Sequence, residues 1–288
     1  MSTEKNQPMI DEQFLAKELE TVKKMAAEEL NNATYKKLAF NCIDLTTLNS
    51  TDTRDRAKMF ADNVNNLYNE YGEFGNVAAI CVYPTMVKTV EETLQLPEVN
   101  IAAVAGGFPS SMTFKSIKVE EAKLAVEAGA DEIDIVISIG EFLDGNYEFV
   151  HEEIAEIKKG IGEAHLKVIL ESGLLKTPEN IWKASLISMN AGADFIKTST
   201  GKESPAATLE AAVVMAHAIK YHYENTGEKI GFKPAGGITT PEEALQYIAA
   251  VKHVLGDDWL NPNMFRIGAS RLANNLLTDL VGTEVKYF

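Results

Sequence analysis

Short apolar runs alternate with longer amphipathic stretches along most of the chain. The runs are rich in Val, Ile and Phe, end in Gly, Pro, Ser or Thr, and recur about every 25–35 residues, the length of one strand plus one crossover helix. About eight runs fit this description, and they are centred on residues 42–45, 79–82, 102–104, 133–136, 168–170, 195–197, 231–233 and 265–267. The pattern predicts a series of strand–helix units.

Helix signals lie between the runs. Thr-Pro at 177–178 and at 240–241 is typical of an N-cap followed by Pro in the first helical position. The amphipathic stretches 116–129 and 178–191 both end at an Ala-Gly-Ala-Asp sequence, in which Gly can supply a left-handed cap before the next strand. Residues 10–30 also have apolar side chains at helical spacing, ahead of the first run. We therefore expect a helical extension over 1–35 and a single domain over 36–288.

Eight strand–helix units in a chain of 288 residues predict a (β/α)8 TIM barrel, with the N-terminal helix added outside it. A doubly wound open sheet is the alternative. Two observations favour the barrel. No GxGxxG sequence follows the first strand. Several strands also carry polar residues on one alternating face, whereas the strands of an open sheet covered on both sides are almost uniformly apolar.

Alternation within each strand decides which side chains point into the barrel. In the fourth strand, Ile133 and Ile135 must face the surrounding helices, so Asp134 points inward. Applied to the other strands, the rule predicts an interior cluster of charged side chains: Asp44, Asp134, Lys167, Glu171, Lys197 and Lys233. A stabilising ion-pair network is the alternative interpretation for any one of them. The three lysines together favour a functional site, because buried charge is costly and a barrel core needs only Val, Ile and Leu.

Lys197 and Lys233 lie at inward positions of neighbouring strands. Each ammonium disfavours charge on the other, and burial does the same, so one of the two can be a neutral amine near pH 7. A neutral, buried lysine is the nucleophile that Schiff-base chemistry requires. The spacing alone leaves open which of Lys167, Lys197 and Lys233 takes this role.

Glycine-rich segments follow the last three strands. In barrels, the loops after strands seven and eight often hold a phosphate on backbone N–H groups and a helix N-terminus. The segment after strand six adds further backbone and a cation. The residues concerned are Thr200, Gly201, Lys202, Gly236, Gly237, Gly268 and Ser270. Together they predict an anion site.

Composition narrows the class of protein further. The net charge of −15 argues against nucleic acid and anionic membranes as general partners, although a few local lysines can still bind a small anion. The two cysteines and five histidines form no metal-ligand spacing, so we expect no metal. The polar first residues hold no secretory leader, and no apolar run approaches the roughly 18 residues of a membrane span, so a cytoplasmic location is expected.

Six segments together resemble the deoxyribose-phosphate aldolase family over most of the chain. They are residues 43–48, 79–84, 129–134, 192–201, 231–237 and 266–270, and the run Lys-Thr-Ser-Thr-Gly with Phe-Lys-Pro-Ala-Gly-Gly downstream is the most specific part. The resemblance implies a (β/α)8 barrel and a class I aldolase. Such an enzyme cleaves 2-deoxy-D-ribose 5-phosphate reversibly to D-glyceraldehyde 3-phosphate and acetaldehyde, with no metal or other cofactor.

By motif position, the resemblance makes Lys197 the Schiff-base lysine, Lys233 the second lysine that lowers its pKa, and Asp134 the proton donor and acceptor. The resemblance and the predicted interior cluster together give a set of expected substrate-binding residues. They are Asp44, Thr46, Cys81, Lys167, Thr200, Gly201, Lys202, Gly236, Gly237, Gly268 and Ser270. The partners implied are the phosphorylated sugar and acetaldehyde, and the assembly we expect is a homodimer.

Two residues and the reaction class have alternatives. Arg271 stands where many family members have a second serine, and we expect it to face solvent, with a phosphate contact as the alternative. Tyr287, near the C-terminus, either enters the site, as a tail tyrosine does in some members, or lies in a free tail. A phosphosugar isomerase or epimerase with a carboxylate base is the alternative enzyme, and a barrel without catalysis that serves as a scaffold is the non-enzymatic alternative. The lysine pair argues against both.

Overall fold

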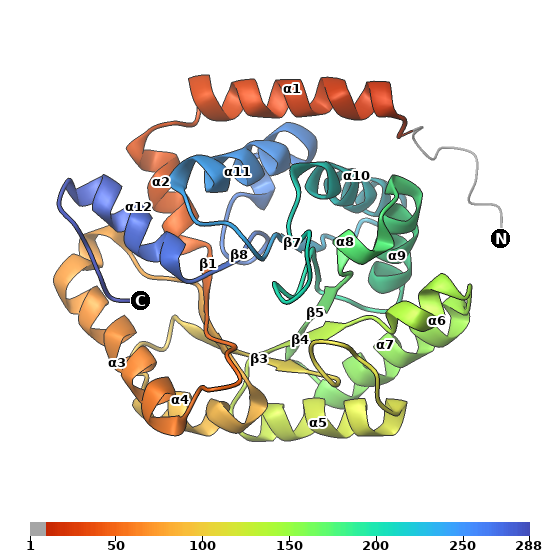
Figure 1. Cartoon of the computed structure of the whole chain (residues 1–288), viewed down its shortest axis with the longest axis horizontal. Coiled ribbons are helices and arrows are strands. Elements are labelled where there is room, and N and C mark those ends of the chain that lie inside the picture. Colours follow the sequence, from red (N-terminus) through yellow and green to blue (C-terminus); the bar gives the residue numbers. More distant parts are fainter. Residues whose placement is uncertain (1–9) are drawn as a thin grey trace.

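The computed structural model describes residues 10–288 and forms a barrel of eight parallel strands surrounded by helices (Figure 1). The strands are β1 Ile43–Thr46, β2 Ala79–Val82, β3 Asn100–Ala105, β4 Glu132–Val136, β5 His165–Ile169, β6 Phe195–Lys197, β7 Gly231–Lys233 and β8 Ile267–Ala269. Neighbours in the chain are neighbours in the sheet, and β8 also pairs with β1. Two bridges, Phe232 with Phe265 and Ala235 with Gly268, join β7 to β8. The predicted (β/α)8 barrel is confirmed, and the open sheet is excluded.

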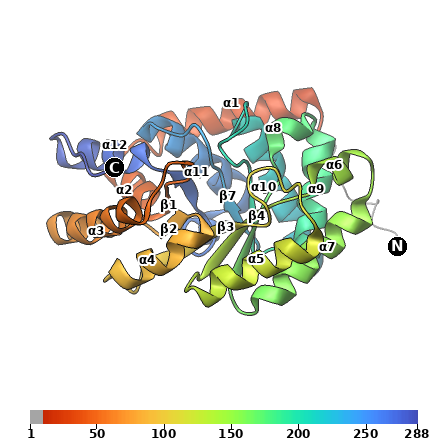
Figure 2. The ribbon, with the colours of Figure 1, turned by 60° about the horizontal axis from the view of Figure 1, so that its bottom comes forward.

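Helices fill the connections between the strands and form the outer ring (Figures 1 and 2). Their bounds are α1 Glu12–Glu28, α2 Ala33–Asn41, α3 Arg54–Tyr71, α4 Val87–Thr93, α5 Lys115–Glu127, α6 Ile139–Leu143, α7 Tyr147–Ile161, α8 Ser172–Leu175, α9 Pro178–Asn190, α10 Leu209–Thr226, α11 Pro241–Leu255 and α12 Arg271–Val281.

The predicted helix ends are confirmed within two residues. Helix α9 begins at Pro178 and α11 at Pro241, and in α11 the N-cap Thr240 and Glu243 form a reciprocal capping box. Past the ends of α5 and α9, Gly129 and Gly192 have φ values of +109° and +97°. Residues that carry a side chain rarely adopt this backbone conformation, so glycine allows the chain to turn directly into the next strand.

Helix α1 lies outside the ring, across α10 and α11 (Figure 1). It buries Leu15, Val22 and Ala26 on the side that faces these helices, and its Glu18 accepts a hydrogen bond of 2.8 Å from His217 on α10. Residues 1–9, on which the expectation about a secretory leader rests, lie outside the described residues. Within residues 10–288, no helix combines the length and the apolar character that a bilayer span requires.

The two faces of the strands have different compositions. Ile133, Ile135 and Ile137 belong to the apolar core between strands and helices, as the alternation predicts. Inside the barrel, Ala79 and Cys81 of β2 and Ala102 and Val104 of β3 form a separate apolar cluster with Leu48, which follows β1. Strands β1, β4, β5, β6 and β7, and Arg266 just before β8, contribute charged side chains to the interior, and these form the candidate site.

Candidate active site

Seven ionisable side chains form a buried network inside the barrel, each no more than 3% exposed. They are Asp44, Glu132, Asp134, Lys167, Lys197, Lys233 and Arg266. We call this set the charged core. Of the residues predicted to point inward, it contains the three lysines and both aspartates.

The lower part of the charged core lies near the N-terminal ends of the strands. Arg266, just before β8, donates to Asp44 at 2.6 Å and to Glu132 at 2.7 Å. Lys167 donates to the same two carboxylates, at 3.1 Å in the case of Asp44. Two bases thus bridge two acids, and every ion in this part has a partner of opposite charge.

The upper part of the charged core is a lysine pair joined by one carboxylate oxygen. Lys197 and Lys233 both donate to Oδ2 of Asp134, each at 2.7 Å. Their Nζ atoms are therefore at most twice that distance apart. Lys233 also pairs with Asp44 at 2.5 Å, whereas Lys197 has Asp134 as its one ion-pair partner among the described residues. Lys197 is thus the less compensated of the two lysines.

The neighbours of each lysine decide the direction of its pKa shift. Burial alone would lower the pKa of Lys233, but the carboxylates of Asp134 and Asp44 outweigh it, and its pKa lies above the ordinary value. At Lys197, burial is the largest effect and the charge on Lys233 adds to it. Together they outweigh Asp134 and hold the pKa of Lys197 below its ordinary value.

The other five groups remain charged near neutral pH. Burial would raise the pKa of Asp134, but the surrounding lysines outweigh it and lower that pKa, and the pKa values of Asp44 and Glu132 are also lowered. Burial would lower the pKa values of Lys167 and Arg266, but the carboxylates outweigh it and raise both. A neutral Lys197 therefore leaves three cations and three anions, so the charged core is electrically balanced when Lys197 has lost its proton.

Sequence reasoning missed Glu132 and Arg266. Glu132 shares a face of β4 with Asp134, so the alternation rule that found Asp134 could also have found it. Arg266 precedes β8 and lies two residues before Gly268 on the same side. Glu171 was assigned to the cluster and is buried, but it has no ion pair with these residues. The strand ends at Ile169, and Glu171 has a φ of +53°, which turns its side chain toward Thr200.

Replacement of Arg266 by methionine is expected to lower the free energy of unfolding by about 3–5 kcal/mol, because it leaves two buried carboxylates short of one cation. Urea unfolding followed by circular dichroism measures the effect. Arg271→Met is the control, since Arg271 is exposed and its loss should change the free energy by no more than about 0.5 kcal/mol. Equal stability of the two variants would contradict the structural role of Arg266.

Above Lys197, a cavity of about 280 Å³ opens at the C-terminal ends of the strands. The predicted residues that line it are Thr46, Lys197, Thr200, Gly201, Lys202, Gly236, Gly237, Gly268 and Ser270, and Arg271 lines it as well. The lining contains three basic side chains and no acidic one, in a chain whose net charge is −15. Helix α12 begins at its edge, so backbone N–H groups and a helix dipole add to the positive potential. The cavity is suited to a small anion.

The shape of this cavity depends on Gly236. Its φ is +93°, and a Cβ atom at this position would lie 3.0 Å from Cα of Gly201 and 2.7 Å from Cβ of Ala206. A side chain there would push the loop after β6 away from the loop after β7. Lys202 donates to the carbonyl oxygen of Leu48 and connects the same loop to the one after β1.

The other predicted binding residues lie below the cavity. Asp44 and Lys167 belong to the charged core and are fully buried. Cys81 is fully buried in the small apolar cluster, and burial raises the pKa of its thiol. Among residues 10–288, no group of three or more His, Cys, Asp or Glu side chains is arranged to hold a metal ion.

The structure places Arg271 and Tyr287, the two residues for which the sequence left alternatives. Arg271 is exposed and also lines the cavity. The tail lies along α3 and α12: the Tyr287 hydroxyl donates to Glu70 at 2.5 Å, and the Tyr287 N–H donates to Asn274 at 3.0 Å. Tyr287 is therefore held by α3 and α12 and does not line the cavity above Lys197.

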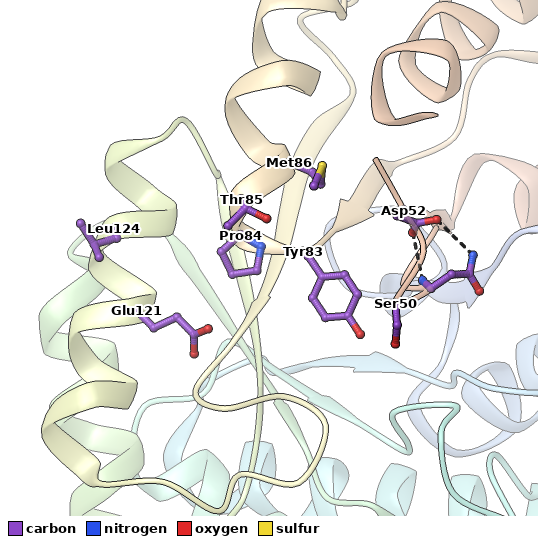
Figure 3. A pocket seen from close by; sticks show the side chains of 9 residues that line it. Ser50, Asp52, Tyr83, Pro84, Thr85, Met86, Glu121 and Leu124 are labelled. Atoms are coloured by element: carbon purple, nitrogen blue, oxygen red, sulfur yellow. Dashed lines mark hydrogen bonds between the residues drawn. The ribbon is translucent and has the colours of Figure 1, made fainter. Parts of the chain in front are cut away.

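Two other hollows lie at the same end of the barrel. One, of about 610 Å³, lies between the loops after β1 and β2 and helix α5 (Figure 3). In it, Asp52 accepts hydrogen bonds from Asn49, and the Tyr83 ring lies between Pro84 and Ser50 (Figure 3). The second, of about 760 Å³, is lined by exposed apolar side chains that include Met112 and Phe114, and also by Glu171. Neither is lined by a residue of the charged core.

Comparison with known proteins identifies the family of the chain. A family model described as DeoC/LacD family aldolase matches residues 38–274. Deoxyribose-phosphate aldolase of Homo sapiens is 44% identical over 248 residues, which cover 83% of this chain and 78% of the human protein. A Caenorhabditis elegans protein described by the same activity name is 48% identical over 256 residues, covering 88% of this chain and 84% of that protein.

A solved structure, the aldolase QR15, has the same architecture. It superimposes with a TM-score of 0.70 at 31% identity, over 84% of this chain and 96% of that one. Residues 38–274, which the family model matches, include all eight strands of the barrel and every residue of the charged core. The chain therefore belongs to the DeoC/LacD aldolase family, and it is an aldolase, a carbon–carbon lyase.

Proposed function

We propose that the enzyme cleaves 2-deoxy-D-ribose 5-phosphate reversibly to D-glyceraldehyde 3-phosphate and acetaldehyde through a Schiff base on Lys197. The observation that carries the proposal is the state of Lys197, the one base of the charged core whose pKa is lowered, at the floor of a cavity with a basic lining. The activity named for the human relative supports the choice of substrate.

The first step is attack of the neutral Lys197 amine on the C1 aldehyde of the open-chain sugar. Uptake of one proton from solvent and loss of water give an iminium ion, which is the electron sink for the cleavage step. Lys233, whose pKa is raised, stays protonated beside the reacting nitrogen and keeps the pKa of Lys197 low. The iminium adds one positive charge next to Asp134, whose carboxylate stabilises it.

The second step breaks the bond between C2 and C3. The C3 hydroxyl loses its proton to Asp134 through Lys233 or a water, and C3 becomes the aldehyde carbon of glyceraldehyde 3-phosphate. The electron pair of the broken bond moves to C2, and the iminium becomes an enamine. Protonation at C2 and addition of water then release acetaldehyde and restore the Lys197 amine.

The cavity contributes binding energy remote from the bonds that change. A phosphate held by Lys202 and by backbone N–H groups after β7 and β8 places C1 of the sugar near Lys197, which lines the same cavity. Lys167 makes all its ion pairs within the charged core, so we assign it to the balance of charge around Asp134 rather than to direct substrate contact.

Reduction with sodium borohydride tests the proposal directly. In the presence of acetaldehyde, the imine should be trapped as an ethyl group on Lys197, located by peptide mass mapping. Without an aldehyde, the same peptide should stay unmodified. An ethyl group on Lys167 or Lys233, or no adduct at all, would overturn the assignment. An isomerase or epimerase with a carboxylate base would also give no adduct, so the experiment separates the two enzyme classes.

Three further expectations stay predictions. The phosphorylated sugar and acetaldehyde are the small-molecule partners that the proposed reaction requires. The homodimer and the cytoplasmic location were inferred from the sequence, and sedimentation and cell fractionation would measure them.

A further inference from the structure

Glu171 differs from every other buried carboxylate in residues 10–288, because it has no ion pair. It is 1% exposed, whereas Asp44, Glu132, Asp134 and Glu153 each lie within 4.0 Å of a lysine or arginine nitrogen. Burying a carboxylate without a cation is unfavourable unless hydrogen bonds compensate for the lost hydration. Its hydrogen-bond donors therefore indicate what it does.

Within the part of the chain that the structure describes, all hydrogen bonds to the Glu171 carboxylate come from one residue, Thr200. The Thr200 N–H lies 3.2 and 3.3 Å from the two carboxylate oxygens, and the Thr200 hydroxyl donates to Oε2 at 2.5 Å. The same hydroxyl accepts a hydrogen bond of 3.0 Å from the N–H of Lys202. A continuous chain of hydrogen bonds thus connects Glu171 to Lys202, which lines the cavity above Lys197.

The backbone conformation around Glu171 directs its side chain toward Thr200. Leu170 N–H donates to the Lys197 carbonyl, and Ser172 N–H donates to the Thr198 carbonyl, both at 2.9 Å. Between these two hydrogen bonds, the chain that leaves β5 advances by two residues, whereas the chain at the end of β6 advances by one. This is the arrangement of a β-bulge, and Glu171 is the extra residue. It has the left-handed conformation, φ +53° and ψ +57°, which non-glycine residues rarely adopt outside functional or strained sites.

The loop that follows Thr200 is packed closely on both sides. A Cβ atom on Gly173 would lie 2.0 Å from the Pro205 carbonyl oxygen, and one on Gly236 would lie 3.0 Å from Cα of Gly201. The loop therefore has little freedom to move toward either neighbour. Glu171 supplies the polar attachment at the end of the loop nearest Lys197.

We propose that Glu171 is a positioning residue, which holds Thr200 and, through it, Lys202 at the wall of the anion-binding cavity. Both donors of Thr200 are engaged by Glu171, so Thr200 connects Glu171 to Lys202 and does not itself donate to the phosphate. Burial raises the pKa of the Glu171 carboxyl, and the hydrogen bonds from Thr200 oppose that shift. The inference rests on the proposed function, because it assigns this loop to the phosphate of the substrate.

The test compares Glu171→Asn with Glu171→Gln. Asparagine tolerates the left-handed backbone but is one methylene too short to reach Thr200, whereas glutamine keeps both the length and an acceptor oxygen. We expect Glu171→Asn to raise KM for 2-deoxyribose 5-phosphate by about tenfold, the ratio typical of a lost hydrogen bond to a charged group, with kcat nearly unchanged. Glu171→Gln should restore most of the loss in KM. Glu203→Gln is the matched control, since Glu203 lines the same hollow as Glu171 but is exposed, and it should match the wild type.

Borohydride labelling of Lys197 with acetaldehyde separates this inference from the proposed function. Acetaldehyde has no phosphate, so its rate of labelling should be the same in the wild type and in all three variants. Normal labelling with an unchanged KM in Glu171→Asn would overturn the positioning role alone. Slower labelling in Glu171→Asn would show that Glu171 acts on Lys197 itself and would also overturn it. Absence of labelling in the wild type would refute the Schiff base.

A double-mutant cycle with Thr200→Ala covers the case in which Glu171→Asn fails to fold. If Glu171 acts through Thr200, Thr200→Ala and Glu171→Gly, which tolerates the left-handed backbone, should raise KM by similar factors, and the two changes combined should raise it no further than either alone. Additive effects on KM would show that the two residues act separately and would contradict the proposal.

Discussion

Both Lys197→Met and Lys197→Arg are expected to lose aldol cleavage by a factor on the order of 10⁴ or more, because neither side chain can form an imine. A coupled assay for glyceraldehyde 3-phosphate measures the loss, and borohydride should leave no ethyl group on either variant. Lys183→Arg, an exposed lysine on α9, is the control and should retain full activity. Substantial turnover in Lys197→Met would refute the role of Lys197 as nucleophile.

The two variants should differ in stability. The charged core is balanced when Lys197 is neutral, so methionine preserves the balance while the permanently charged guanidinium of arginine adds an excess buried cation. We therefore expect Lys197→Met to have the higher free energy of unfolding, measured with urea at neutral pH. A more stable Lys197→Arg would indicate that Lys197 is normally charged and would contradict the balance of three cations and three anions.

Replacement of Lys233 by leucine is expected to shift the acid limb of the pH–rate profile to higher pH. Lys233 carries the positive charge that disfavours a proton on Lys197. Without it, the three carboxylates face only Lys167 and Arg266, and a proton on Lys197 restores the balance. Neutral amine is present above the pKa of Lys197, so a higher pKa removes it at neutral pH. A neighbouring charge shifts a pKa by about 1–3 units, so turnover at pH 7 should fall by about 100-fold, with recovery as the pH is raised.

Lys118→Leu is the matched control for this experiment. It also removes a buried lysine, but Lys118 pairs with Glu153 between α5 and α7, outside the charged core. It should lower stability and leave the acid limb in place. If Lys233→Leu has the same acid limb as the wild type, the lysine pair does not set the pKa of Lys197.

Strand alternation was sufficient to predict most of the charged core. Isoleucines that must face the helices determined the direction of Asp134, and the same rule placed Lys167, Lys197 and Lys233 inside the barrel. The rule holds only where a strand is regular. Glu171 lies two residues beyond the end of β5, in a left-handed conformation, so alternation gave it the wrong neighbours.

The remaining features depend on contacts between distant parts of the chain. Glu132 and Arg266 lie more than 130 residues apart, and only the closure of the barrel brings them together. The attachment of Tyr287 to α3 and α12 likewise depends on Glu70 and Asn274, which no local pattern connects with the tail. The glycine-rich loops were predictable because positive φ values restrict the residue type, but which side chains share their cavity was not.

The balance of charge in the barrel also constrains how the sequence can evolve. A mutation that replaces only Arg266 leaves a buried carboxylate without compensation, so it should be removed by selection unless an acid is lost as well. Relatives that lack an arginine at this position should therefore also lack an acid at position 44 or 132, and the two losses should be inherited together. A library that redesigns the barrel interior would do best to exchange these positions in oppositely charged pairs, leaving the lysine at 197 as the one base in excess of the acids.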